Sequence, residues 1–222
     1  MPEFIPEMQS VMITDEEFRH CKALRLREES LIMISNGNGM CARTRVANVH
    51  AHSLELTPIQ FLPNHNESPY RYHLCIGSLD SKDRMEFVVE KAVELGVQSV
   101  MIVSTRYSSK KVYNRERLLT KAIAAMKQSC RAHLPDVSIH ASLRDALKEI
   151  SAEDHILCDE NGTAPGEIKS ETCVYVGPEG GFHENEIELI RALPNSDNWK
   201  LSHSRLRAET AALAALSHVA AM

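Results

Sequence analysis

Hydrophobic and polar positions divide the chain into two parts with different periodicities. Up to about residue 62, short apolar stretches alternate with polar positions, a pattern typical of half-buried strands. The clearest stretches, residues 31–34 and 41–49, flank the turn-forming residues 35–39, and residues 53–57 alternate in the same way. One short helix is predicted before them, because Thr14 and Glu17 have the spacing of a capping box.

A polar stretch bounded by prolines, residues 63–69, predicts a domain boundary. We therefore expect one domain over residues 1–66 and a second over residues 70–222. In the second, predicted strands alternate with predicted helices, which indicates an α/β domain with a parallel sheet and helices on both faces. The expected strands are 72–76, 97–104, 155–158, 172–176 and 200–202, and the expected helices are 85–95, 115–132, 143–150, 184–192 and 209–221.

Composition excludes several classes of protein. Of the 222 residues, 43% are hydrophobic and 25% are charged, as in ordinary soluble domains. No apolar run approaches the ~18 residues of a membrane span, and the first residues lack the order of a signal peptide. We expect a cytoplasmic protein without a membrane partner. The six cysteines form no C-x-x-C pair and the 11 histidines show no ligand spacing, so we expect no metal.

Positive charge is concentrated in two stretches, although the whole chain carries −5. Residues 106–131 contain eight basic residues against one acidic residue, a net charge of +7, and residues 19–45 contain six against two. Such patches suggest contact with a polyanion, and a solvated helix face is the alternative. The basic residues of the first stretch are Arg106, Lys110, Lys111, Arg115, Arg117, Lys121, Lys127 and Arg131.

Three loops are candidates for a ligand site, because ligands of open α/β sheets bind beyond the carboxyl ends of the strands. They are residues 158–162, 177–181 and 201–206. Glycines at 177, 180 and 181 would let the backbone approach a ligand closely. Glu179 inside that turn would repel a pyrophosphate, which favours a neutral or cationic nucleoside. A tight structural turn is the alternative explanation.

The last segment places Arg205, Arg207 and Glu209 close together before an alanine-rich helix. That helix either packs against its own sheet or forms a dimer seam beside an active site.

Several motifs together resemble one family. Residues 177–182 (GPEGGF), 204–211 (SRLRAETA), 84–97 and 20–26 occur in the order found in the RsmE-type 16S ribosomal RNA uridine-N3 methyltransferases. The resemblance implies a PUA-like β-barrel followed by a SPOUT domain with a carboxyl-terminal trefoil knot. It also implies S-adenosyl-L-methionine as cofactor, a homodimer, and methylation of N3 of a uridine in 16S rRNA or the small ribosomal subunit.

The same resemblance implies site residues. Arg207, held by Glu209, is the candidate catalytic pair, with an ion pair that only braces the fold as the alternative. The candidate cofactor-binding residues are Cys158, Asp159, Gly177, Glu179, Gly180, Gly181, Leu201, Ser202, Ser204 and Leu206. The candidate RNA-binding residues are Arg25, Arg106, Arg115, Arg117, Lys121, Lys127 and Arg131. The chain departs from the family pattern at Ser202 and Cys130, where glycine is usual, and at Ala208, where threonine is common.

Two other functions fit parts of the pattern. One is a SPOUT methyltransferase acting on another RNA target, such as a ribose 2′-hydroxyl of transfer RNA. The other is a non-catalytic RNA-binding dimer that has lost its cofactor. A Rossmann dehydrogenase is excluded, because the chain lacks the glycine fingerprint G-x-G-x-x-G.

Overall fold

The computed structural model describes residues 2–109, 111–168 and 171–222. Lys110, one of the basic residues counted above, lies outside them. The chain forms two units: the first comprises Met1–Glu67 and Met126–Leu134, and the second comprises Ser68–Ala125 and Pro135–Met222. A segment from the middle of the sequence thus belongs with the amino-terminal residues, which the polar stretch at 63–69 does not indicate.

The first unit is built on a four-stranded antiparallel sheet in the order β1-β4-β3-β2. The strands β1 (Val11–Ile13), β2 (Leu31–Ser35), β3 (Met40–Val49) and β4 (Leu54–Pro63) surround a core with helix α1 (Asp15–Ala23). The expected capping box is wrong: the side chain of Thr14 does not cap α1, and its hydroxyl donates instead to Asp15 Oδ2 at 2.8 Å.

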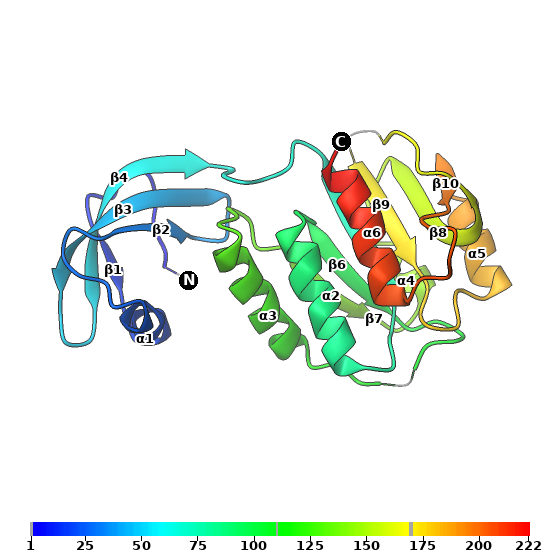
Figure 1. Ribbon diagram of the computed structural model, residues 1–222, viewed down its shortest axis with the longest axis horizontal. Coiled ribbons are helices and arrows are strands. Elements are labelled where there is room, and N and C mark those ends of the chain that lie inside the picture. The colour runs from blue at the N-terminus through cyan, green and yellow to red at the C-terminus, as the bar shows by residue number, and fades with distance from the viewer. Residues whose placement is uncertain (1, 110, 169–170) are drawn as a thin grey trace. The chain divides into compact units, whose positions relative to one another are not determined.

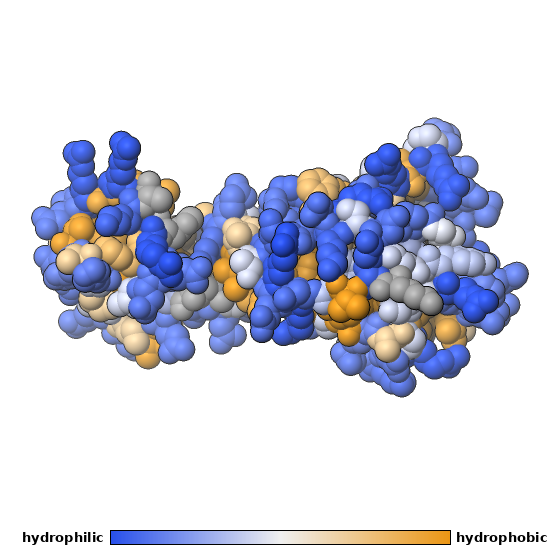
Figure 2. Space-filling view, turned by 90° about the horizontal axis from the view of Figure 1, so that it is seen from below, coloured by the Kyte–Doolittle hydropathy of each residue, from blue (hydrophilic) through white to orange (hydrophobic). Residues whose placement is uncertain are grey.

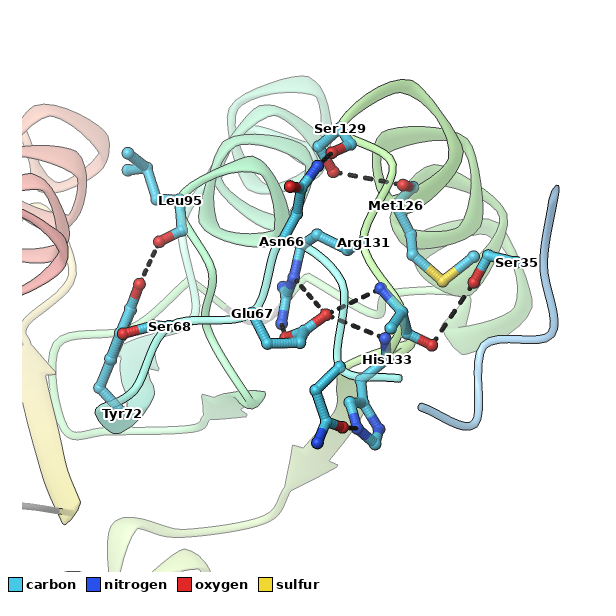
Figure 3. A network of polar contacts seen from close by, with 12 residues as sticks. Ser35, Asn66, Glu67, Ser68, Tyr72, Leu95, Met126, Ser129, Arg131 and His133 are labelled. Atoms are coloured by element: carbon cyan, nitrogen blue, oxygen red, sulfur yellow. Dashed lines mark hydrogen bonds and ion pairs between the residues drawn. The ribbon is translucent and has the colours of Figure 1, made fainter. Parts of the chain in front are cut away.

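Residues 126–134 join the first unit through polar contacts with the segment that follows β4 and with the end of β2 (Figure 3). Glu67 accepts hydrogen bonds from the backbone N–H groups of Ala132 and His133, both at 2.9 Å, and pairs with Arg131 at 2.6 Å. Cys130, in the same segment, has φ +53°, a left-handed conformation that glycine adopts without strain. This backbone conformation gives a physical reason for the glycine that is usual at this position.

The second unit contains a six-stranded, entirely parallel sheet in the order β10-β8-β9-β5-β6-β7. Three expectations change here. Strand β7 was not expected, β10 precedes the predicted strand at 200–202, and β8 continues through residues 158–162, which were expected to form a loop. The strands are β5 (Arg71–Gly77), β6 (Ser99–Val103), β7 (Asp136–His140), β8 (Asp154–Thr163), β9 (Glu171–Val176) and β10 (Ser196–Trp199).

Helices cover both faces of this sheet (Figure 1). Helix α6 packs against α2 and against β9 and β5. On the opposite face, Leu143 and Ala146 of α4 and Ile190 of α5 share a core with alternate residues of the strands, such as Cys173 and Tyr175. The helices are α2 (Lys82–Glu94), α3 (Arg115–Gln128), α4 (Leu143–Ala146), α5 (Glu184–Arg191) and α6 (Ala208–Ala220), so α3 and α4 end before their predicted limits. Within the described residues, no helix combines the length and hydropathy of a membrane span.

Candidate active site

A cavity of about 1130 Å³ lies in the second unit, where β9 and β10 end and beside residues 157–161 of β8. Its walls come from all three segments selected from the sequence, together with Arg84 of α2 and the first residues of α6. Figure 2 views the molecule from below, toward this edge of the sheet, and the surface there is mostly hydrophilic. All ten residues expected to bind the cofactor line this cavity: Cys158, Asp159, Gly177, Glu179, Gly180, Gly181, Leu201, Ser202, Ser204 and Leu206.

Residues 177–181, here called the glycine loop, connect β9 to α5. A Cβ atom on Gly177 would lie 2.8 Å from the backbone of Gly181, and one on Gly180 would lie 2.8 Å from Cβ of Tyr107. Gly181 has φ +75°, which L-residues rarely adopt. The close approaches at Gly177 and Gly180 are thus to the protein itself.

The middle of β8 contributes Cys158, Asp159 and Glu160 to the cavity wall. Burial raises the pKa of the Cys158 thiol to about 12, so this group stays protonated and inert at neutral pH. The carboxylate of Asp159 is 14% exposed and lies 3.7 Å from Nη2 of Arg191 on α5. This wall therefore supplies two carboxylates, those of Asp159 and Glu160, and no reactive thiolate.

Residues 200–207, here called the carboxy-terminal loop, connect β10 to α6. The backbone N–H of Lys200 donates to Thr163 at the end of β8 at 2.6 Å, which ties the loop to the sheet. Ser202 is not among the described residues with positive φ, and its Oγ accepts a hydrogen bond from the N–H of Ser204 at 3.1 Å. Serine at 202 is therefore compatible with this backbone.

Arg84, in the first turn of α2, connects the glycine loop to the start of α6. Its Nη2 lies 2.9 Å from Glu179 of the glycine loop and 3.0 Å from Asp80, and its Nη1 lies 3.4 Å from Glu209 of α6. Partial burial works against the charged guanidinium, but Glu209, Glu179 and Asp80 together raise the pKa of Arg84. We call these four residues the Arg84 cluster.

The expected pair of Arg207 and Glu209 is absent. Glu209 pairs with Arg84, and its side chain is only 12% exposed. Arg207, the N-cap residue of α6, has an exposed side chain that makes no hydrogen bond or ion pair with any residue the structure describes. Arg207 lines the cavity, so its guanidinium is available to a ligand there.

Several of the predicted RNA-binding side chains have acidic partners. In the second unit, Arg117 and Lys121 both pair with the buried Glu86, and Arg115 pairs with Asp136 at 3.3 Å. The positive charge of α3 is therefore smaller at the surface than its sequence suggests.

The first unit contains three more of these candidates. Lys127 pairs with Glu17 at 2.6 Å. Arg131 is enclosed, with a side chain only 2% exposed, so it does not face solvent where a phosphate would bind. Arg25 is exposed, as is Arg106 in the second unit.

Comparison with known proteins gives the family. Residues 66–220 match the sequence model of the RNA methyltransferase domain. The chain belongs to this family. The match confirms the family resemblance at the level of an RNA methyltransferase, and the cavity described above lies wholly within the matched residues.

Curated members of the RNA methyltransferase family are similar over most or part of the chain. The ribosomal RNA small subunit methyltransferase E of Bacillus subtilis is 27% identical, over 97% of this chain and 91% of that protein. The protein of the same name from Rickettsia conorii is 31% identical, over 62% of this chain and 59% of that protein. A solved structure of a ribosomal RNA small subunit methyltransferase E from Neisseria gonorrhoeae, bound to S-adenosyl methionine, superposes with a TM-score of 0.87 at 29% identity, covering 99% of this chain and 94% of that chain.

Sequence reasoning did not identify Arg84 as a site residue of this RNA methyltransferase domain. Arg84 stands in the first turn of a helix, where a basic residue has no obvious partner, and Glu209 lies 125 residues further along the chain. Strands β5 and β9 pair in parallel, which brings the segments after both strands to one edge of the sheet. The parallel sheet predicted from the sequence was therefore the one signal that could have indicated that Arg84 lies near the glycine loop. In the described part of the chain, no three His, Cys, Asp or Glu side chains gather as a metal site would require.

Proposed function

We propose that this chain transfers the methyl group of S-adenosyl-L-methionine to N3 of a uridine in the 16S rRNA of the small ribosomal subunit. The single observation that carries the proposal is the cavity, whose walls are formed by the three segments selected from the sequence. The solved relative that binds S-adenosyl methionine shares this fold at 29% identity, which supports the same cofactor here.

The cavity suits a cationic nucleoside. Leu157, Val176 and Leu201 supply apolar contacts for an adenine ring, and Glu179 and Asp159 supply negative charge. Such a combination of apolar walls and a few placed polar groups is typical of small-molecule sites, and about 1130 Å³ exceeds the upper range of drug-sized pockets. The size leaves room for an acceptor base beside the cofactor. S-adenosyl-L-methionine supplies, when bound, an electrophilic methyl group on a positively charged sulfur.

N3 of uridine is an imide nitrogen that carries a proton, and it lies on the pairing edge of the base. The protein must therefore hold the base unpaired, with N3 aligned to the methyl group. N3 would lose its proton to solvent at the open side of the cavity and take the methyl group. The broken sulfur–methyl bond would leave its electron pair on the sulfur of S-adenosyl-L-homocysteine, the leaving group. While N3 is deprotonated and not yet methylated, negative charge is spread onto the uracil carbonyl oxygens, and we assign its stabilisation to the guanidinium of Arg207.

RNA phosphates would bind at the cationic rim, which we define as Arg106, Lys200, Arg205 and Arg207. All four side chains are exposed, and the last three line the cavity. Within the described residues, none of the four pairs with a carboxylate, whereas Arg115, Arg117 and Lys121 do. Phosphate contacts at the rim would hold the strand in register without reading its sequence. Arg25 is a further candidate on the first unit.

The proposal includes the architecture and assembly implied by the family resemblance. The first unit would be the PUA-like RNA-binding domain, and the second would be the SPOUT domain with its trefoil knot.

We also propose a cytoplasmic homodimer. The pair of contacting helices α2 and α6 supports a dimer surface, because Phe87 on α2 remains 43% exposed. Sedimentation of the purified chain would show twice the monomer mass, and the monomer mass alone would exclude the dimer.

A transfer experiment tests the function. The purified chain is incubated with labelled S-adenosyl-L-methionine and small ribosomal subunits that lack the modification, and the RNA is digested to nucleosides. The proposal predicts label in N3-methyluridine. Label in a 2′-O-methylated nucleoside would instead indicate another SPOUT target, and absence of both label and cofactor binding would indicate a non-catalytic RNA-binding protein.

A further inference from the structure

We propose that Arg84 is a positioning residue, which fixes the glycine loop and the start of α6 relative to each other and so shapes the cofactor site. This inference rests on the function proposed above. The observation behind it is that one guanidinium contacts carboxylates on two segments that border the cavity: Glu179 of the glycine loop through Nη2 at 2.9 Å and Glu209 of α6 through Nη1 at 3.4 Å.

The two contacts use different nitrogens of one planar group, so the geometry depends on arginine. A guanidinium presents donors in a fixed fork, whereas a lysine ammonium is a single point charge on a flexible stem. The Glu179 carboxylate is fixed further by the backbone N–H of Asp80, which donates to Oε1 at 3.2 Å. The carboxylates are 33% and 12% exposed for Glu179 and Glu209, so both are partly shielded from water.

Removal of the guanidinium would leave these carboxylates without their shared cation. Like charges held close together repel each other, and movement of one loop relieves this repulsion at the lowest cost in free energy. Glu209 is also two residues from Arg207, the exposed cation that we assign to the uracil carbonyls. With Arg84 in place, Glu209 pairs with Arg84 and not with Arg207, so the Arg207 guanidinium stays available to the substrate.

The test compares the Arg84→Gln and Arg84→Lys variants with the intact chain. Calorimetric titration gives the affinity for S-adenosyl-L-methionine, and steady-state methyl transfer gives kcat and the KM for the RNA. Arg84→Gln should bind the cofactor roughly tenfold more weakly and lower kcat, because coupling within one charged network is of that order. The KM for RNA should stay within about twofold, because Arg106, Lys200 and Arg205 of the cationic rim are unchanged.

Rescue distinguishes positioning from a general loss of folding. Arg84→Lys should recover part of the affinity, since an ammonium can pair with one carboxylate. The double variant Arg84→Gln, Glu209→Gln should also recover part of the affinity for S-adenosyl-L-methionine, because the Glu209 carboxylate that has lost its cation is removed. Arg71→Gln is the matched control: Arg71 pairs with Glu171 at 3.7 Å at the other end of β5, and its loss should leave affinity and kcat unchanged.

Two results would overturn the inference. One is an Arg84→Gln variant whose unfolding midpoint falls while cofactor affinity and kcat stay within twofold of the intact chain. The other is a folded Arg84→Lys variant that matches the intact chain in every parameter. If Arg84→Gln does not fold, Arg84→Lys and Glu209→Gln provide the same comparison. Failure of the intact chain to bind cofactor would instead contradict the proposed function.

Discussion

Arg131 and Glu67 form an enclosed ion pair in the first unit, with Nη2 and Oε2 2.6 Å apart and side chains only 2% and 7% exposed. Glu67 also accepts the backbone N–H groups of Ala132 and His133. This carboxylate therefore joins the segment after β4 to residues 131–133 (Figure 3). A basic residue expected at an RNA surface has a structural role instead.

We expect Glu67→Gln to destabilise the first unit by about 3–5 kcal/mol, because it leaves the Arg131 guanidinium buried without its counter-charge. Urea unfolding followed by circular dichroism measures the effect. Glu29→Gln is the matched control, since Glu29 pairs with Arg45 at 3.4 Å at an exposed position, and its loss should cost less than about 1 kcal/mol. Equal unfolding midpoints for the two variants would contradict the structural role of Glu67.

The glycine loop gives a second prediction. Gly177→Ala would place a Cβ atom 2.8 Å from the backbone of Gly181, and backbone cannot move aside as a side-chain tip can. We expect a loss of about 1–3 kcal/mol in stability and roughly tenfold weaker binding of S-adenosyl-L-methionine by calorimetry. Gly166→Ala has no atom within 4 Å of the added carbon and should match the intact chain in both measurements. Unchanged cofactor affinity in Gly177→Ala would show that the loop does not form the site.

The cationic rim predicts how RNA affinity depends on salt. Each phosphate contact contributes about 0.7–0.9 to the slope of log K against log salt concentration, so Lys200→Gln with Arg205→Gln should reduce that slope by about 1.5. Filter binding of small-subunit ribosomal RNA at several salt concentrations measures it. Arg117→Gln should change the slope less, because Arg117 already pairs with Glu86. A larger change in slope for Arg117→Gln than for the Lys200→Gln, Arg205→Gln variant would indicate that the phosphates bind at α3 instead of at the cationic rim.

The partly or fully buried His73 and His155 predict that the free energy of unfolding decreases in acid. Burial lowers the pKa of His73, where Arg71 acts in the same direction and Glu171 opposes it. Burial also lowers the pKa of His155, against an opposing effect of Asp154. The unfolded chain takes up these protons near the ordinary histidine pKa of about 6.5, whereas the folded chain does so only at lower pH. The stabilisation is therefore complete above about pH 6.5 and is lost as the pH falls toward the folded-state pKa values.

Urea midpoints at pH 7.5, 6.5 and 5.5 would measure this effect, and we expect them to decrease in that order. The double variant His73→Gln, His155→Gln should show a flatter profile, although it begins from a lower midpoint because buried hydrogen bonds are lost. A profile of unchanged slope in the double variant would assign the acid sensitivity to other groups.

The alternation of strands and helices, and the three segments at the carboxyl ends of strands, could be predicted because they depend on local patterns. The polar partners could not. Glu67 and Arg131, and Arg84 and Glu209, meet through the fold, and nothing near either residue in sequence indicates its partner.

The errors in the predicted strands have local causes. Strand β8 continues through residues 159–163, a polar stretch typical of a loop, and its pairing with β10 shifts register between Asn198 and Trp199. Strand β7 has five residues, two of them buried, and among the described strands it pairs with β6 alone. Such a short strand gives little periodic signal.

One measurement tests the central claim most directly: methyl transfer by the intact chain and by a variant whose cavity is blocked. Ser202 lines the cavity, and Ser202→Trp would fill it from a loop without disturbing the sheet. With labelled S-adenosyl-L-methionine and unmodified small subunits, the intact chain should give labelled N3-methyluridine, and Ser202→Trp should give none at an unchanged unfolding midpoint. No N3-methyluridine from the intact chain, or equal amounts from both, would contradict the account.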